Sequence, residues 1–468
     1  MLPDDVLLSI FEFCANEEGK KKELQQVWQT LVHMCRRWRS LVFGSPRSLN
    51  LQLICTPSTP ARVSDIPVVW PPLPLVFESS YHHPYMVNVV AVLEHRNRLS
   101  RIYITNISSS SLNKVLAAMQ QPFPELTHLQ LERCSYGESM GVFPDSLLGG
   151  SAPHLREIRF RDIPFPGLPK LLLSATHLTD LLLYDLPRSG FGYISSEAIA
   201  TALSTLTSLR ELYLGFRYLS LPVRTSRRPP PPKPFVLPVL SGFEFKGAGK
   251  YLEDLVVRID APLLKKLVIT FFDQIVFNVP QLLQFISRTS VLKAPEKAHV
   301  FVRFDSATIK LSSRLGAPNY SVRILCENSY RLVSSLERVC TSCSPPLSTL
   351  EDLYIYECPY RLSIWPDNIE DSLWPELLRP FAAVKNLYLS KKVQPLIMPS
   401  LQTLGGERSA EVLPTLQNIF LERLKRSGPV RKAVRQFVST RQASRPIAVS
   451  RWDGRGKFMR GLISESDE

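Results

Sequence analysis

The chain has 468 residues, 44% of them hydrophobic, and carries a net charge of +14 at pH 7. This length exceeds the usual size of one compact domain, and the apolar content permits a large core, which argues against a mainly disordered protein. No segment is apolar enough for a membrane span, the N-terminus is too acidic for a secretory signal, and eight scattered cysteines form no disulfide framework, so we expect a cytoplasmic or nuclear protein.

The first 45 residues show the pattern of a small module of three helices. Pro3 suits the first turn of a helix, and Asp4 and Asp5 place negative charge near the positive helix end. A single apolar stripe follows at helical spacing and comprises Val6, Leu7, Ile10, Phe11 and Cys14. Two further sets predict the other helices: Val27, Trp28, Leu31 and Cys35, then Trp38, Leu41 and Val42. About 45 residues bury little core alone, so we expect the module to pack on a neighbour.

This module resembles an F-box through Leu2, Pro3, Val6, Leu7, Ile10, Phe11 and the block Cys35–Arg36–Arg37–Trp38. F-boxes dock on the Skp adaptor of cullin-RING ubiquitin ligases. The resemblance implies a noncatalytic substrate-recruiting subunit that acts in ubiquitin-dependent protein degradation. It also implies the residues that contact the adaptor: Leu2, Pro3, Val6, Leu7, Ile10, Phe11, Leu31, Cys35 and Trp38. The ordinary alternative is a helical hairpin that caps the next domain.

A repeated pattern decides the predicted fold of the remaining chain. Residues 46–95 should form connecting strands and a first repeat helix, and residues 96–460 then carry L-x-x-L-x-L with apolar substitutes. Its ten copies start at Leu99, Leu126, Leu155, Leu178, Leu209, Leu240, Leu264, Leu350, Val384 and Leu416. The starts lie about 23 to 34 residues apart outside one gap, and helical patterns lie between them, which is typical of irregular leucine-rich repeats. We therefore expect an α/β solenoid with strands on its concave side. The whole resembles the F-box/leucine-rich-repeat proteins of mushroom-forming fungi.

Two insertions interrupt the repeats. The first, near residues 224–234, contains consecutive prolines and predicts an extended loop, which is alternatively a ligand for a proline-recognition domain. The second spans residues 270–349 and alternates as half-buried strands do around Val300, Ile309 and Val322, which predicts a hairpin. Residues 461–468 should form a disordered tail.

The sequence contains no recognisable active-site motif. It contains none of the common hydrolase, metalloprotease or dinucleotide motifs, so we expect a protein that is not an enzyme and has no cofactor. Cys340 and Cys343, flanked by Cys326 and Cys358, could form a four-thiolate zinc site. We favour a packing role, because Cys340 continues an apolar helical stripe.

Positive charge is concentrated between Arg423 and Arg460, which contain twelve Lys or Arg and one acid, Asp453. Clustered cations suit nucleic acid. However, Val430, Val434 and Phe437 also form a helical apolar stripe, so a final repeat with a solvated basic face is favoured. Nucleic acid is therefore an unlikely partner.

Tyrosine is enriched where side chains should point to the concave side. The thirty positions that flank the repeat leucines hold six of the fifteen tyrosines: Tyr103, Tyr184, Tyr213, Tyr354, Tyr356 and Tyr388. Strand propensity accounts for part of this enrichment, and a target-binding face accounts for the rest. We predict that these residues bind a protein substrate. The alternatives are a repeat scaffold without a ligase role and a basic nucleic-acid-binding repeat protein.

Overall fold

A computed structural model of the protein describes the following residues: 2–15, 30–45, 52–56, 73–80, 86–134, 146–186, 193–217, 233–272, 278–289, 295–303, 306–312, 320–325, 332–342, 347–357, 373–402, 411–423, 428–442 and 446–452. None of the helices in this part of the chain is long and apolar enough to cross a membrane. Several predictions lie outside these residues: Val27 and Trp28, the prolines before 233, the cysteines at 326, 343 and 358, and the tail 461–468.

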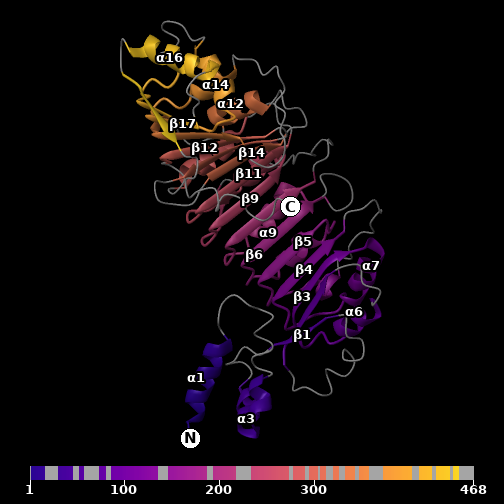
Figure 1. Ribbon diagram of the computed structural model, residues 1–468. Coiled ribbons are helices and arrows are strands. Elements are labelled where there is room, and N and C mark those ends of the chain that lie inside the picture. Colours follow the sequence, from indigo (N-terminus) through magenta and orange to yellow (C-terminus); the bar gives the residue numbers. More distant parts are fainter. Residues whose placement is uncertain are drawn as a thin grey trace. The chain divides into compact units, whose positions relative to one another are not determined.

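The chain divides into two compact units, Met1–Arg217 and Tyr218–Glu468. The first unit begins with helix α1 (Asp4–Ala15), and a helical stretch at residues 30–34 leads into helix α3 (Arg36–Gly44) (Figure 1). Because residues 16–29 are not described, the three-helix module stays a prediction.

The rest of the first unit alternates strands with helices. The strands, all parallel and paired in chain order, are β1 (Leu53–Cys55), β2 (Leu75–Ser80), β3 (Leu99–Ile107), β4 (His128–Arg133), β5 (Glu157–Arg161), β6 (Asp180–Leu186) and β7 (Glu211–Phe216). The helices are α6 (Met86–Leu93), α7 (Ser109–Ala118), η1 (Leu147–Gly150), α8 (Leu168–Leu172) and α9 (Ser196–Leu203). The expected leucine-rich-repeat-like α/β arrangement is therefore present.

One backbone conformation recurs near the C-terminal ends of three strands. Asn106, Asp162 and Asp185 each lie two residues after the last buried residue of the L-x-L pattern, and each has φ of 56°. Asn and Asp tolerate this left-handed conformation better than most residues. At Asp162 this position carries a buried charge, because its carboxylate pairs with Arg133 at 2.5 Å and also with Arg217.

The second unit continues the same pattern around a rearranged centre. Its main strands, in spatial order, are β9 (Gly242–Gly247), β11 (Lys266–Phe272), β14 (Tyr320–Leu325), β13 (Ser306–Ser312), β12 (Lys297–Val302), β15 (Asp352–Glu357), β16 (Asn386–Leu389), β17 (Asn418–Glu422) and β18 (Ala448–Trp452). Strands β8 (Phe235–Val236) and β10 (Ile259–Asp260) pair separately. The helices are α10 (Gly249–Val256), α11 (Pro280–Arg288), α12 (Leu332–Ser342), η4 (Leu347–Thr349), α13 (Leu373–Leu378), α14 (Gln394–Gln402) and α16 (Pro429–Gln442).

The predicted insertion at 270–349 is part of the sheet. Strands β12, β13 and β14 form an antiparallel meander, with β14 parallel to β11 and β12 parallel to β15. The hairpin prediction is confirmed, and the meander fills the place where the repeat pattern fails. The short connections after β12 and β13 explain the reversal, since parallel neighbours need a longer crossover.

Burial separates two faces along most of the parallel strands, whereas the meander β12–β14 also buries residues on its second side, including His299 and Thr308. Along β4, Leu129 and Leu131 are buried while His128, Gln130 and Glu132 are half-buried, as the period of two requires. Helices between the strands cover the leucine side, and α12 contacts both β13 and β14. We call the opposite side the open face. The C-terminal helix follows this plan, because Ala433, Val434 and Phe437 of α16 point inward. Arg441, counted in the predicted basic face, is instead buried and donates to the Leu413 carbonyl oxygen at 2.9 Å.

Candidate functional site

The two described N-terminal helices pack through one aromatic contact. Phe11 of α1 and Trp38 of α3 meet edge to face, with ring centroids 4.9 Å apart. Arg37 fastens α3 to the start of α1, because its guanidinium donates to the Leu2 carbonyl oxygen at 2.6 Å and pairs with the Asp4 carboxylate at 2.5 Å. This packing fixes which side of α1 faces away from α3.

The packing divides the nine predicted adaptor contacts into covered and exposed residues. Leu7 and Phe11 are only 4% and 1% exposed and lie in the packing of the module, and their contact with an adaptor stays a prediction. Leu31 and Trp38 are half-buried, and the exposed Cys35 caps α3 by accepting the Trp38 backbone N–H at 3.4 Å. The remaining exposed members are Leu2, Pro3, Val6 and Ile10.

Two exposed apolar residues beside this face were missing from the prediction. Phe13 is 73% exposed and Met34 is 63% exposed. Phe13 lies three residues after Ile10 and seven after Val6, so helical spacing alone places all three on one side of α1. The i, i+4, i+7 spacing of Val6, Ile10 and Phe13 could therefore have been found in the sequence.

Of the three predicted tyrosines in the first unit, two stack on each other and the third lies on a different strand. Tyr184 of β6 and Tyr213 of β7 stack with centroids 4.2 Å apart, and the Arg161 guanidinium lies 4.9 Å from the Tyr184 ring centre. Gly215 leaves room for this stack, because a Cβ there would lie 2.6 Å from a Tyr213 ring carbon. Tyr103 lies on β3, away from the pair, and burial raises the pKa of its hydroxyl.

The second unit brings its three predicted tyrosines together in a longer stack. Along one row of the open face, register pairs His299 with Tyr354, Tyr354 with Tyr388, and Tyr388 with Phe420. Their ring centroids lie 4.6, 4.1 and 4.4 Å apart, and the interplanar angles are 10° or less. We call these four residues the aromatic ladder. Neighbouring strands lie 4.7–4.9 Å apart, so the pairing itself sets this spacing.

Three more aromatic residues extend the patch. Phe301 of β12 and Tyr356 of β15 stack at 5.1 Å in the next row. Trp452 of β18 lies 5.6 Å from Tyr356 and 5.7 Å from Tyr388, with its ring inclined by 55° and 69° to theirs. The Trp452 ring therefore contacts both tyrosine rings at an inclined angle and does not stack parallel to them.

The surroundings of the ladder and of the neighbouring Tyr356 shift the pKa values of their side chains. Burial raises the pKa of Tyr354, and Tyr388 and Asp352 add to this effect. Burial also raises the pKa of Tyr356, helped by Tyr388 and Glu422. At the opposite end of the ladder, burial together with the positive charges of Lys297 and Lys310 lowers the pKa of His299 to about 4. The ladder is thus polarised, with carboxylates around its tyrosines and ammonium groups beside its histidine.

The sequence therefore predicted the compact tyrosine patch but not its full extent. Phe420 occupies the same flanking position as the tyrosines and could have been found by counting every aromatic residue. His299 and Phe301 lie where the repeat pattern fails, and Trp452 belongs to a last strand without a leucine signature. A role of these residues in binding stays a prediction.

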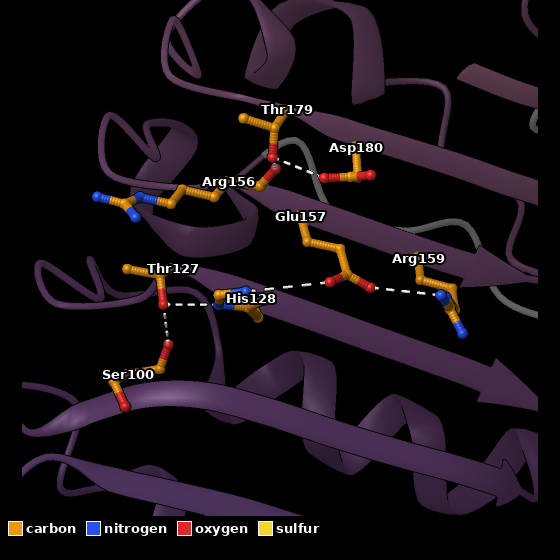
Figure 2. A network of polar contacts seen from close by, with 8 residues as sticks. All are labelled: Ser100, Thr127, His128, Arg156, Glu157, Arg159, Thr179 and Asp180. Atoms are coloured by element: carbon orange, nitrogen blue, oxygen red, sulfur yellow. Dashed lines mark hydrogen bonds and ion pairs between the residues drawn. The ribbon is translucent and has the colours of Figure 1, made fainter. Parts of the chain in front are cut away.

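The open face of the first unit is polar by comparison. Figure 2 shows Glu157 of β5 between His128 of β4 and Arg159, with oxygen–nitrogen distances of 4.0 and 3.5 Å. Thr127 donates to the Ser100 carbonyl oxygen at 2.8 Å. The His128–Glu157 and Thr127–Ser100 contacts join neighbouring repeats, whereas Glu157 and Arg159 both belong to β5. In the described parts of both units, no group of three His, Cys, Asp or Glu side chains is placed to hold a metal ion.

Comparisons with known proteins do not assign the chain to a family. No family model matches the chain, and no curated protein matches it. Among solved structures, the chain is similar to the leucine-rich repeat-containing protein LegL7 from Legionella pneumophila, with 14% identity and a TM-score of 0.29 over 83% of this chain and 97% of that one. The class of the protein, a leucine-rich-repeat-like α/β protein, rests on its own strand register and repeat spacing.

Proposed function

We propose that the protein is the noncatalytic substrate-recruiting subunit of a Skp/cullin/F-box type ubiquitin ligase. In this proposal α1 docks the Skp adaptor and the open face of the repeats holds a protein target. The observation that carries it is an exposed apolar surface formed by Leu2, just before α1, and by Val6, Ile10 and Phe13 of α1, which are 52%, 39%, 43% and 73% exposed.

The arrangement of α1 supports docking over ordinary packing. Leu7 and Phe11 already supply its inward side, and Phe11 contacts Trp38. The exposed apolar residues on the outward side of α1 therefore take no part in its packing on α3. Large apolar side chains gathered on one exposed side mark an interaction surface, whereas scattered ones do not.

A binding measurement with purified Skp adaptor tests the proposal. The double substitution Ile10→Ser and Phe13→Ser removes two exposed anchors and leaves Phe11 in place, so the helix should remain folded. Truncating central apolar anchors costs about 2 kcal/mol or more, so adaptor affinity should fall at least about 30-fold.

The matched control is Val87→Ser, which changes an exposed apolar residue of α6 that is 81% exposed. This variant should bind the adaptor as the wild type does. Failure of the wild-type chain to bind, or unchanged binding by the double variant, would contradict the ligase role. Circular dichroism of each variant checks that helix content is retained.

A second candidate function is a repeat interaction scaffold without a ligase role. The aromatic ladder supports it, because that surface is built entirely from strands of the second unit and needs no adaptor. Target capture without adaptor binding would favour this candidate. The described residues give less support to nucleic acid, since Arg441 of the basic helix is buried.

A further inference from the structure

The two tyrosine stacks differ at their ends. In the first unit, Arg161 pairs in register with Tyr184 and lies over its ring, so a guanidinium covers the end of the Tyr184–Tyr213 stack. In the second unit, the residue in register beyond Phe420 is Ser450. Serine is too short to cover a phenyl ring. Among the described residues, the stacking partner of Phe420 is Tyr388 alone, so the other side of the ring faces Ser450.

A carboxylate lies beside this half-buried ring. Glu422 is two residues after Phe420 on β17, and side chains two apart share one face of a strand. One carboxylate oxygen of Glu422 accepts the backbone N–H of Lys391 at 3.0 Å, which holds the group in place. Within the described chain, Glu422 forms no ion pair with a lysine or arginine side chain. Its charge is felt at the patch, since it contributes to the raised pKa of Tyr356.

We propose that Phe420, Glu422 and Ser450 form a docking site for an arginine side chain of a protein partner. The guanidinium lies over the outer side of the Phe420 ring, in the place that Arg161 occupies on Tyr184, and donates to the free oxygen of Glu422. This proposal deepens the target-binding part of the proposed function and rests on it, but it does not depend on adaptor docking.

The chemistry selects arginine over other groups. A guanidinium is planar, so it stacks on a ring while its N–H groups point sideways to a carboxylate, which an ammonium group cannot do equally well. The chain uses cation–ring contacts elsewhere on its open faces, with the Lys310 ammonium 5.7 Å from the Phe301 centroid. An acidic segment or a nucleic-acid backbone would meet the negative charge of Glu422. The half-buried Trp452, opposite Glu422 in register, extends across β17 to Tyr388 and Tyr356, so its ring borders the site on the Glu422 side and adds apolar surface.

Peptide binding to the full chain tests the proposal. The probe is a fluorescently labelled, capped peptide of three arginines separated by alanines, with its citrulline and glutamate versions, measured by anisotropy at 0.15 M salt. Citrulline keeps the shape of arginine without its charge. The arginine peptide should bind, and the citrulline version should bind at least about fivefold more weakly.

Ser450→Arg is the decisive variant, because it supplies in the chain the guanidinium that a partner would bring. Position 450 is exposed, so the substitution should fold normally and weaken the arginine peptide at least about fivefold. Glu422→Gln should also weaken it. The matched control is Glu244→Gln, which removes an open-face carboxylate of the same unit that already pairs with Lys266 at 2.6 Å, and it should bind as the wild type does.

The proposal is overturned by any of three results: no binding of the arginine peptide to the wild type, equal binding of the citrulline or glutamate peptide, or wild-type affinity in Ser450→Arg. Adaptor binding, measured in parallel, should be unchanged in Ser450→Arg. If the wild-type chain binds the arginine peptide as expected but does not bind the adaptor, the ligase role is refuted and the proposed arginine site is still supported.

Discussion

His299 provides a pH-dependent test of the aromatic ladder. It is 2% exposed and stacks on Tyr354, and its burial, with Lys297 and Lys310 nearby, lowers its pKa from the ordinary value of 6.5 to about 4. The folded protein therefore holds a neutral imidazole at pH values where the unfolded chain already binds a proton. Stability from this residue is complete above pH 6.5 and is lost as the pH falls from 6.5 toward 4.

The size of the effect follows from the two pKa values. Each pKa unit corresponds to about 1.4 kcal/mol, so the difference between 6.5 and about 4 is worth roughly 3 kcal/mol in the free energy of unfolding. His299→Phe keeps a flat ring beside Tyr354 and removes the titrating group. Between pH 6.5 and pH 4, the wild type should lose about 3 kcal/mol more than this variant.

Two measurements check this expectation. Nuclear magnetic resonance titration of the imidazole protons reports the pKa of His299 directly, and His299→Phe assigns the signal. Urea unfolding at pH 7.0, 5.5 and 4.5 then compares the two proteins, so that the carboxylates common to both cancel. A measured pKa above 6, or equal acid sensitivity of wild type and variant, would refute the reasoning.

Three further predictions concern stability. Asp162→Asn should cost about 3–5 kcal/mol in thermal unfolding, because it leaves the buried Arg133 without its carboxylate while asparagine still tolerates the φ of 56°; a loss below 1 kcal/mol would show that the pair contributes little. Tyr388→Ala should cost about 1–3 kcal/mol by removing two stacked ring pairs, and Tyr388→Phe clearly less; equal losses in urea unfolding would place the contribution in the hydroxyl. Gly149→Ala should cost about 1–3 kcal/mol, because φ is +68° and a Cβ would lie 2.8 Å from a proline side chain, whereas Gly44→Ala, with nothing within 4 Å, should be nearly neutral in the same calorimetric scan.

The N-terminal helices show how far periodicity alone can lead. The spacing of Val6, Leu7, Ile10 and Phe11 correctly predicted a helix, and the resemblance to an F-box implied that all four residues contact the adaptor. The contact between Phe11 and Trp38 divides their apolar stripe into an inner and an outer part. This division depends on where a second helix packs, which the spacing within one helix does not contain.

The repeat region separates the two kinds of information more sharply. Alternation along each strand is a local property of the backbone, so the sequence by itself determined the strands, their buried leucines and the open position of Tyr388. Which strand lies beside which is decided by long-range pairing. The meander β12–β13–β14 places His299 next to Tyr354, although 54 intervening residues separate them in the chain. Only the tertiary structure could therefore join residues from separate repeats into the aromatic ladder and leave Ser450 at its end, because register across strands is set by the packing of the whole sheet.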